Sequence, residues 1–179
     1  LLLTMAPTVA FAAESPADAP GTSEDAGSSV AEPAELDLNV GSIEISAEGY
    51  KVNGGELVAH TGKYVLTGTT TEHTVTVTGG EQEITLGGVN IDVSGMQTGI
   101  PCAFAIEGGQ VTLTLADGST NTLTSGLIDD KKTGISCAGL WVNQGAALII
   151  EGDTGALTAV GGGTGSHSFD NKGKASGIG

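Results

Sequence analysis

The sequence contains no arginine and only six lysines, against 21 aspartate and glutamate residues, so its 179 residues carry a formal net charge of −15. Proteins that bind nucleic acid neutralise phosphates with clustered lysine and arginine. Attraction to anionic lipid needs the same groups. We therefore expect no nucleic-acid partner, and no membrane insertion once a secretory signal has been removed.

Aromatic residues are also scarce, at 3%, and after the N-terminus no ten-residue stretch places apolar residues at helical spacing. The chain has 30 glycines and many threonines instead. Short alternating segments such as SIEIS (42–46), HTVTVTGG (73–80) and QEITLGGVNIDVSG (82–95) are separated by glycine-containing turns. This composition favours many short strands, so we expect an all-β fold.

The first 35 residues differ from the rest. LLLTMAPTVAFAA (1–13) combines a short apolar run with small residues around Ala12, which is typical of the core and cleavage site of a secretory signal. Residues 14–35 carry six acids, no base and no aromatic residue, so we expect a disordered linker. The folded domain is then predicted over 36–179, with the first residues of the chain lying inside a truncated signal peptide.

A sequence repeat of about 30 residues recurs within this domain. TVTVTGG (74–80) aligns with AFAIEGG (103–109), ITL (84–86) aligns with LTL (113–115) and LII (148–150), and NIDVSG (90–95) aligns with NTLTSG (121–126). SGIG (176–179) resembles the start of CAGLWV (137–142). This periodicity favours a parallel β-solenoid, in which neighbouring copies pair strand to strand. A β-sandwich is the main alternative, because it also uses short alternating strands.

The solenoid hypothesis assigns side chains to faces. Residues predicted to point inward are Val75, Val77, Ile84, Leu86, Ile91, Val93, Phe104, Ile106, Val111, Leu113, Leu115, Leu123, Leu140, Val142, Leu148, Ile150 and Leu157. The intervening threonines are expected to face solvent. Asn90 and Asn121 are expected to stack at one corner. We predict an N-terminal coil or cap over 36–73, three matched coils over 74–162, and a connector with the start of a further coil over 163–179.

The segments quoted above, together with YVLTGTTTEH and CAGLWVNQGAALIIEGDTGALTAVGGG, resemble a module of repeat-rich secreted surface proteins of Gram-positive Firmicutes, often labelled carbohydrate-binding-domain-containing. The resemblance covers about residues 40–179. It implies a right-handed parallel β-helix of about three to five coils, truncated at its C-terminus and displayed at the cell surface, and it transfers no catalytic residue.

Ligand-binding candidates are few. Trp141 is the single tryptophan and is expected to face outward beside Ala105, where an indole can stack on a sugar; covering a neighbouring loop is the alternative. Asp129 and Asp130 lie in the longest insertion, LIDDKKTG, and are weak candidates for binding Ca²⁺ or another ligand. The adjacent lysines and an ordinary solvated loop argue against that role.

Cys102 and Cys137 each close a connector just before a matched strand. Stacking would place their Cα atoms 4.4–6.8 Å apart, the range a disulfide needs. An oxidising exterior permits the bond, and a pair of stacked buried thiols is the alternative.

Candidate catalytic acids are Asp92, Asp117, Glu151 and Asp153. They are expected to be solvated turn acids, because Asp117 and Asp153 lie in Asp-Gly or Gly-Asp turns and the chain has no arginine to serve lyase chemistry. His60, His73 and His167 are scattered along the chain. We therefore expect no enzyme and no required cofactor, but a secreted module for adhesion or for binding polysaccharide, a host glycan or a cell-wall glycan. A structural stalk joined to further coils or domains of the same polypeptide is the alternative, and a polysaccharide lyase or glycoside hydrolase is a distant third.

Overall fold

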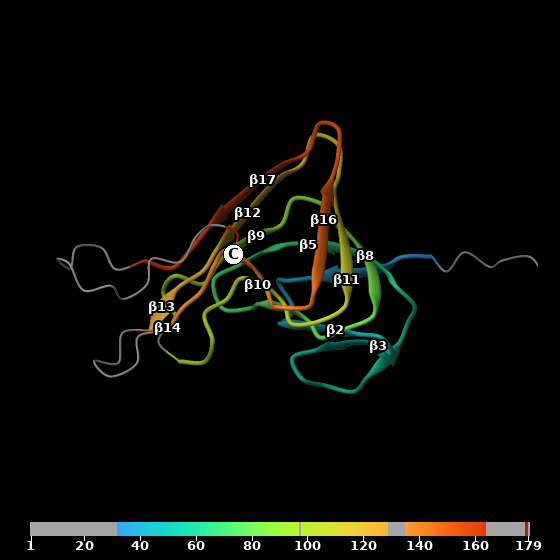
Figure 1. Ribbon diagram of the computed structural model, residues 1–179, viewed down its shortest axis with the longest axis horizontal. Helices are drawn as coiled ribbons and strands as arrows, with labels where there is room; N and C mark the ends of the chain where they lie inside the picture. The colour runs from blue at the N-terminus through green and yellow to red at the C-terminus, as the bar shows by residue number, and fades with distance from the viewer. Residues whose placement is uncertain (1–31, 97, 129–134, 164–177, 179) are drawn as a thin grey trace, which may run out of the picture. The chain divides into compact units, whose positions relative to one another are not determined.

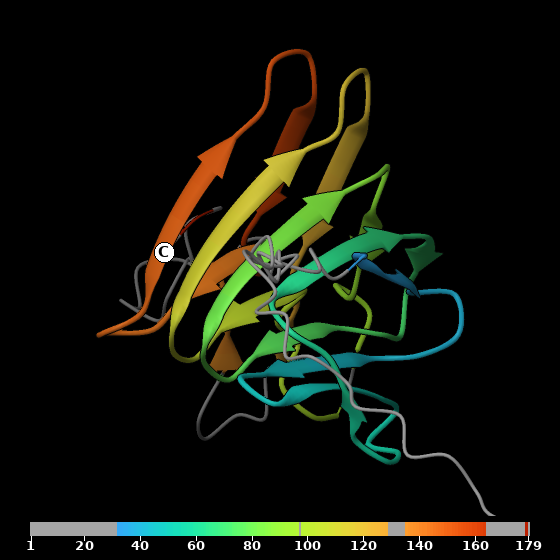
Figure 2. The same cartoon turned by 90° about the vertical axis from the view of Figure 1, so that its right-hand side faces the viewer.

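The computed structural model describes residues 32–96, 98–128, 135–163 and 178, and every regular element in them is a β-strand (Figures 1 and 2). The predicted signal and most of the predicted linker lie outside the described residues. Ala34 and Glu35, the last linker residues, belong to the first strand. The all-β class follows from a sequence in which β-branched residues alternate with polar ones between glycine turns.

The strands form three main sheets, and each sheet takes its strands from several separate parts of the chain. The first, entirely parallel, has the order β1 (Ala34–Asp37), β5 (Lys63–Thr67), β8 (Glu81–Leu86), β11 (Gln110–Leu115) and β16 (Ala147–Glu151). The second has the order β15 (Leu140–Val142), β10 (Phe104–Ile106), β7 (Val75–Val77), β2 (Ile43–Ser46), β3 (Gly49–Val52) and β4 (Val58–Ala59). The third, also parallel, has the order β17 (Ala156–Val160), β12 (Thr120–Thr124), β9 (Asn90–Asp92) and β6 (Thr69–Thr70). A two-stranded antiparallel hairpin joins β13 (Leu127–Ile128) to β14 (Ile135–Ser136).

The predicted fold class, a right-handed parallel β-helix of three to five coils, is wrong. The strands form separate sheets, and the six-stranded sheet is mixed because β2 pairs with β3, and β3 with β4, in antiparallel fashion. The reason lies in residues 43–59, where a tight turn between Ser46 and Gly49 reverses the chain at once. The sequence prediction assigned this stretch to an N-terminal coil or cap and did not include antiparallel pairing within it.

The predicted pairing between copies is right in some segments and shifted in others. Val75 lies opposite Phe104, and Ile84 lies opposite Leu113, as the alignment requires. In the third copy Val111, not Leu113, lies opposite Leu148, a shift of two residues that keeps the same face inward.

The predicted asparagine ladder is wrong. Asn90 is exposed and pairs with Thr122, whereas Asn121 is fully buried. The cause is a one-residue error in aligning the two segments, because Ile91 lies opposite Leu123. A shift of one residue exchanges the two faces of a strand.

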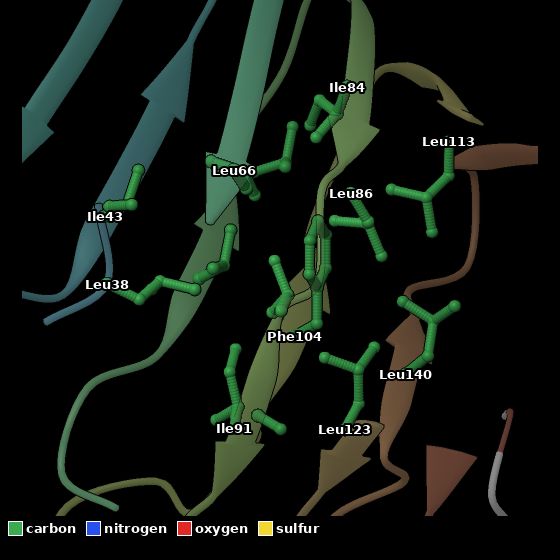
Figure 3. Close-up of a cluster of buried hydrophobic side chains, with 14 of the residues drawn as sticks. Leu38, Ile43, Leu66, Ile84, Leu86, Ile91, Phe104, Leu113, Leu123 and Leu140 are labelled. Atoms are coloured by element: carbon green, nitrogen blue, oxygen red, sulfur yellow. The ribbon is translucent and has the colours of Figure 1, made fainter. Parts of the chain in front are cut away.

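The three sheets share one apolar core (Figure 3). Val75, Ile84, Phe104, Leu113 and Leu123 are each at most 2% exposed, as the alternation predicts. The third copy is less covered: Leu148 and Leu157 are half-buried and Ile150 is 40% exposed. In the described residues, β16 and β17 are paired along one side only, and β15 gains a single parallel bridge from Leu140 to Ile178.

Paired glycines make the corner between the second and first sheets. Gly80 and Gly109 have φ values of 85° and 82°, a left-handed conformation that strongly favours glycine. A Cβ atom on Gly109 would also collide with the carbonyl oxygen of Gly80. The repeated GG in TVTVTGG and AFAIEGG is thus required by both backbone conformation and close stacking.

Candidate functional site

Cys102 and Cys137 are joined in a disulfide, with their Cα atoms 5.2 Å apart. Of the two states that the sequence left open, the structure therefore has the covalent one. The bond connects the residues just before β10 to those just before β15. Both cysteines are buried and pack with Ala105 in a small apolar cluster on the outer side of the six-stranded sheet.

Trp141 lies on this outer side. Its neighbours on each side, Leu140 and Val142, lie opposite Phe104 and Ile106 of the core, and Trp141 itself lies opposite Ala105, as predicted. Trp141 is only partly exposed, because one part of it packs against the cluster of Cys102, Ala105 and Cys137. The small side chain of Ala105 leaves room for the indole to lie over it.

A cavity of about 570 Å³ opens beside the tryptophan. We call it the Trp141 cavity. It is lined by Thr74, Thr76, Met96, Ile100, Cys102, Ala105, Glu107, Ser136, Cys137 and Trp141. Its volume lies within the range of small-ligand sites, and its lining combines apolar side chains with a few polar groups, as such sites do. Ile100 is 65% exposed, so the cavity has an apolar rim.

The two connectors that carry the cysteines are held by backbone and hydroxyl hydrogen bonds. The buried hydroxyl of Ser125 donates to the carbonyl of Ala138 (2.6 Å) and accepts from the N–H of Ala103 (2.8 Å). The N–H of Gly126 donates to the carbonyl of Pro101 (2.8 Å). These bonds join both cysteine-bearing connectors to the end of β12, so the disulfide sits on a fixed support.

Glu107 is positioned by its own main chain. Its N–H donates to the carbonyl of Val77 (2.8 Å), and its carbonyl accepts from Nδ2 of Asn143 (3.2 Å). Its side chain is free to point outward because the inward positions on this strand are taken by Phe104 and Ile106. The cavity thus has one carboxylate on a rigid strand end.

The weak calcium candidates Asp129 and Asp130 lie outside the described residues, as does His167. Within the described ranges no group of three or more His, Cys, Asp and Glu side chains could hold a metal ion.

None of the candidate catalytic acids Asp92, Asp117, Glu151 and Asp153 lines the Trp141 cavity, and three of them accept hydrogen bonds from hydroxyl groups. Asp92 accepts from the Ser94 hydroxyl (2.6 Å), Asp117 accepts from the Thr154 hydroxyl (3.2 Å), and Glu151 accepts from the Thr114 hydroxyl (3.2 Å). Asp92 does line another hollow of about 580 Å³ together with Glu72.

The two described histidines contact backbone carbonyls. Nε2 of His60 donates to the carbonyl of Lys63 (2.7 Å), and Nδ1 of His73 donates to that of Leu38 (2.8 Å). Each ring is thereby used in holding a turn.

Sequence analysis identified Trp141 but missed Glu107, Met96, Ile100 and Ser125. Ser125 had a signal, since the SG pair recurs in NIDVSG and NTLTSG. Glu107 had a weaker sequence signal, because in AFAIEGG it stands at the position of the last threonine of TVTVTGG. Met96 and Ile100 belong to a connector between repeats, where no periodicity predicts which side chains approach the sheet.

Comparison of the chain with family models, with curated proteins and with solved structures finds no match. The described part of the chain contains no helix with the length and apolarity needed to cross a bilayer.

Proposed function

We propose that this protein is a secreted, non-catalytic module that binds polysaccharide at a bacterial surface, and that the Trp141 cavity is its binding site. The observation that carries the proposal is an indole lying beside a cavity that also offers hydroxyl groups and a carboxylate. Sugars present apolar C–H faces and polar edges, so they are recognised by an aromatic face surrounded by hydrogen-bonding groups.

The Cys102–Cys137 disulfide supports a location outside the cytosol, because structural disulfides persist in oxidising compartments. It also supports a binding role for its surroundings. The bond fixes the two connectors from which Met96, Ile100 and Ser136 reach the cavity, and a preformed site loses less conformational entropy on binding.

The test is sedimentation of the full chain with insoluble polysaccharides, namely cellulose, chitin and purified bacterial cell walls. We expect binding to at least one of them and a loss of up to about tenfold in affinity for Trp141→Ala, the range expected for an aromatic contact. Val40→Ala changes an exposed side chain remote from the cavity lining and serves as the control. If the folded wild-type chain binds none of these materials, the structural stalk becomes the better interpretation. If Trp141→Ala binds as well as wild type, the cavity is not the site.

A further inference from the structure

The Trp141 cavity carries a negative charge that no cation in the described part of the chain neutralises. Glu107 is the one titratable group in its lining, because both cysteines are in the disulfide. In the described part of the chain Glu107 forms no ion pair. The two described lysines are engaged elsewhere, Lys51 with Glu44 (3.3 Å) and Lys63 with Glu83 (3.1 Å).

The segment closest in sequence to the cavity wall adds no net charge. Residues 129–134 lie between β13 and β14 and contain two aspartates and two lysines. The whole chain has a formal charge of −15. The negative charge at the cavity therefore disfavours uronates, sulfated sugars and other anionic glycans. At physiological salt this repulsion acts over roughly 8 Å, the Debye length.

Glu107 and Trp141 lie on neighbouring parallel strands and on the same face. Trp141 on β15 is opposite Ala105 on β10, and Glu107 directly follows β10, two residues beyond Ala105. With about 3.3 Å of rise per residue and about 4.8 Å between strands, their Cα atoms are about 8 Å apart. A cation between the two side chains can contact the carboxylate and lie within about 6 Å of the indole centroid, the range of a cation–π interaction.

The remaining lining suits a sugar ring around that cation. Met96, Ile100 and the disulfide supply apolar surface for the face of the ring, beside the exposed carboxylate of Glu107. Thr74 and Thr76 bring hydroxyl groups to the opposite wall.

From this arrangement we infer that the cavity selects glycans with free amino groups, with the ammonium of a glucosamine-type unit bound between Glu107 and Trp141. The inference rests on the proposed function and names the class of sugar that the site prefers. An N-acetylated sugar loses the cation and leaves Glu107 without a partner, and an anionic sugar is repelled.

The test is calorimetric titration of the full chain with two oligosaccharides of equal length, hexa-glucosamine and hexa-N-acetylglucosamine, at a pH that keeps the amines protonated. We expect the amino form to bind at least tenfold more tightly, and Glu107→Gln to remove most of that preference. Glu107→Asp should retain a preference. Glu81→Gln removes one exposed negative charge outside the cavity and is the matched control, expected to leave the preference unchanged.

Equal binding of the two oligosaccharides by wild type overturns the inference and leaves the proposed function standing. An equal loss in Glu107→Gln and Glu81→Gln also overturns it, because general attraction between a polycation and an acidic protein then explains the preference. If neither oligosaccharide binds and the folded chain also fails to sediment with any polysaccharide, the proposed function falls as well.

Discussion

Replacing Asn121 by alanine should destabilise the protein strongly, although the residue lies outside the candidate site. The side chain is fully buried near the start of β12 and makes four hydrogen bonds. Its Oδ1 accepts from the N–H groups of Gly88 (3.0 Å) and Val89 (2.8 Å), and its Nδ2 donates to the Ser119 hydroxyl (2.9 Å) and the Ala156 carbonyl (3.1 Å). It thereby connects three successive copies of the repeat.

The magnitude follows from which partners lose access to water. Val89 is buried, so its orphaned N–H costs about 1–3 kcal/mol. Gly88 and Ala156 are exposed and can bond to water, so the other losses add about 1 kcal/mol in total. We expect Asn121→Ala to lower the free energy of unfolding by about 2–4 kcal/mol, measured by urea denaturation followed by circular dichroism.

A second variant and a control sharpen the test. Asn121→Asp keeps the accepting oxygen but turns the donor toward Ala156 into a second acceptor, so it should also destabilise. Asn39→Ala removes an exposed asparagine and should cost less than about 1 kcal/mol. If Asn121→Ala costs no more than Asn39→Ala, the start of β12 does not depend on this side chain and the reasoning is refuted.

Three further predictions concern other parts of the molecule. Replacing both Cys102 and Cys137 by serine should lower the free energy of unfolding by about 2–4 kcal/mol, given a closed loop of 35 residues; urea denaturation with and without reductant measures this, and an unchanged midpoint contradicts it. Burial, and secondarily Tyr50, raises the pKa of Tyr64, so the contribution of Tyr64 to stability should be constant below about pH 10 and fall above it, because this phenol then ionises in the unfolded chain before it does in the folded protein. Tyr64→Phe should abolish that fall without loss at neutral pH, because the hydroxyl has no hydrogen-bond partner among the described residues; urea denaturation across this pH range would contradict the prediction if the slope persists. Ile149→Lys should reduce concentration-dependent association measured by light scattering, relative to Val40→Lys, because Ile149 is 61% exposed on β16, which is paired along one side only among the described residues; equal association in both variants would exclude that side of β16.

Alternation along single strands was the most informative signal in the sequence. It placed Val75, Ile84 and Phe104 correctly in the core because a strand with one buried face must keep its apolar residues on that face. Alignment between copies was less informative, because sequence similarity predicts the pairing register of neighbouring strands only to within a residue or two. The buried polar residue Asn121 shows what alternation cannot predict. Its side chain stabilises the fold through hydrogen bonds to segments about 32–35 residues away, and no local sequence pattern indicates such bonds.

The departure from a uniform repeat could not be predicted for a different reason. Residues 43–59 contain alternating segments like those of the repeats, and only the turn between them decides whether the next strand pairs antiparallel at once or continues onward. At the candidate site, the sequence placed Trp141 beside Ala105 through pairing alone. The cavity itself depends on two irregular connectors, and irregular backbone has no periodicity from which to predict side-chain positions.

The position of the disulfide has a consequence for local opening. Strands β8 and β11 have neighbouring strands on both sides, whereas the described residues give β15 one neighbouring strand, β10, and a bridge to Ile178. Amide hydrogens near the edge should therefore exchange with solvent sooner than those at the centre. The disulfide at Cys137 lies three residues before Leu140, so it limits how far β15 can separate from β10 during local opening. The strand that carries Trp141 thus stays within reach of its partner even when its own hydrogen bonds open.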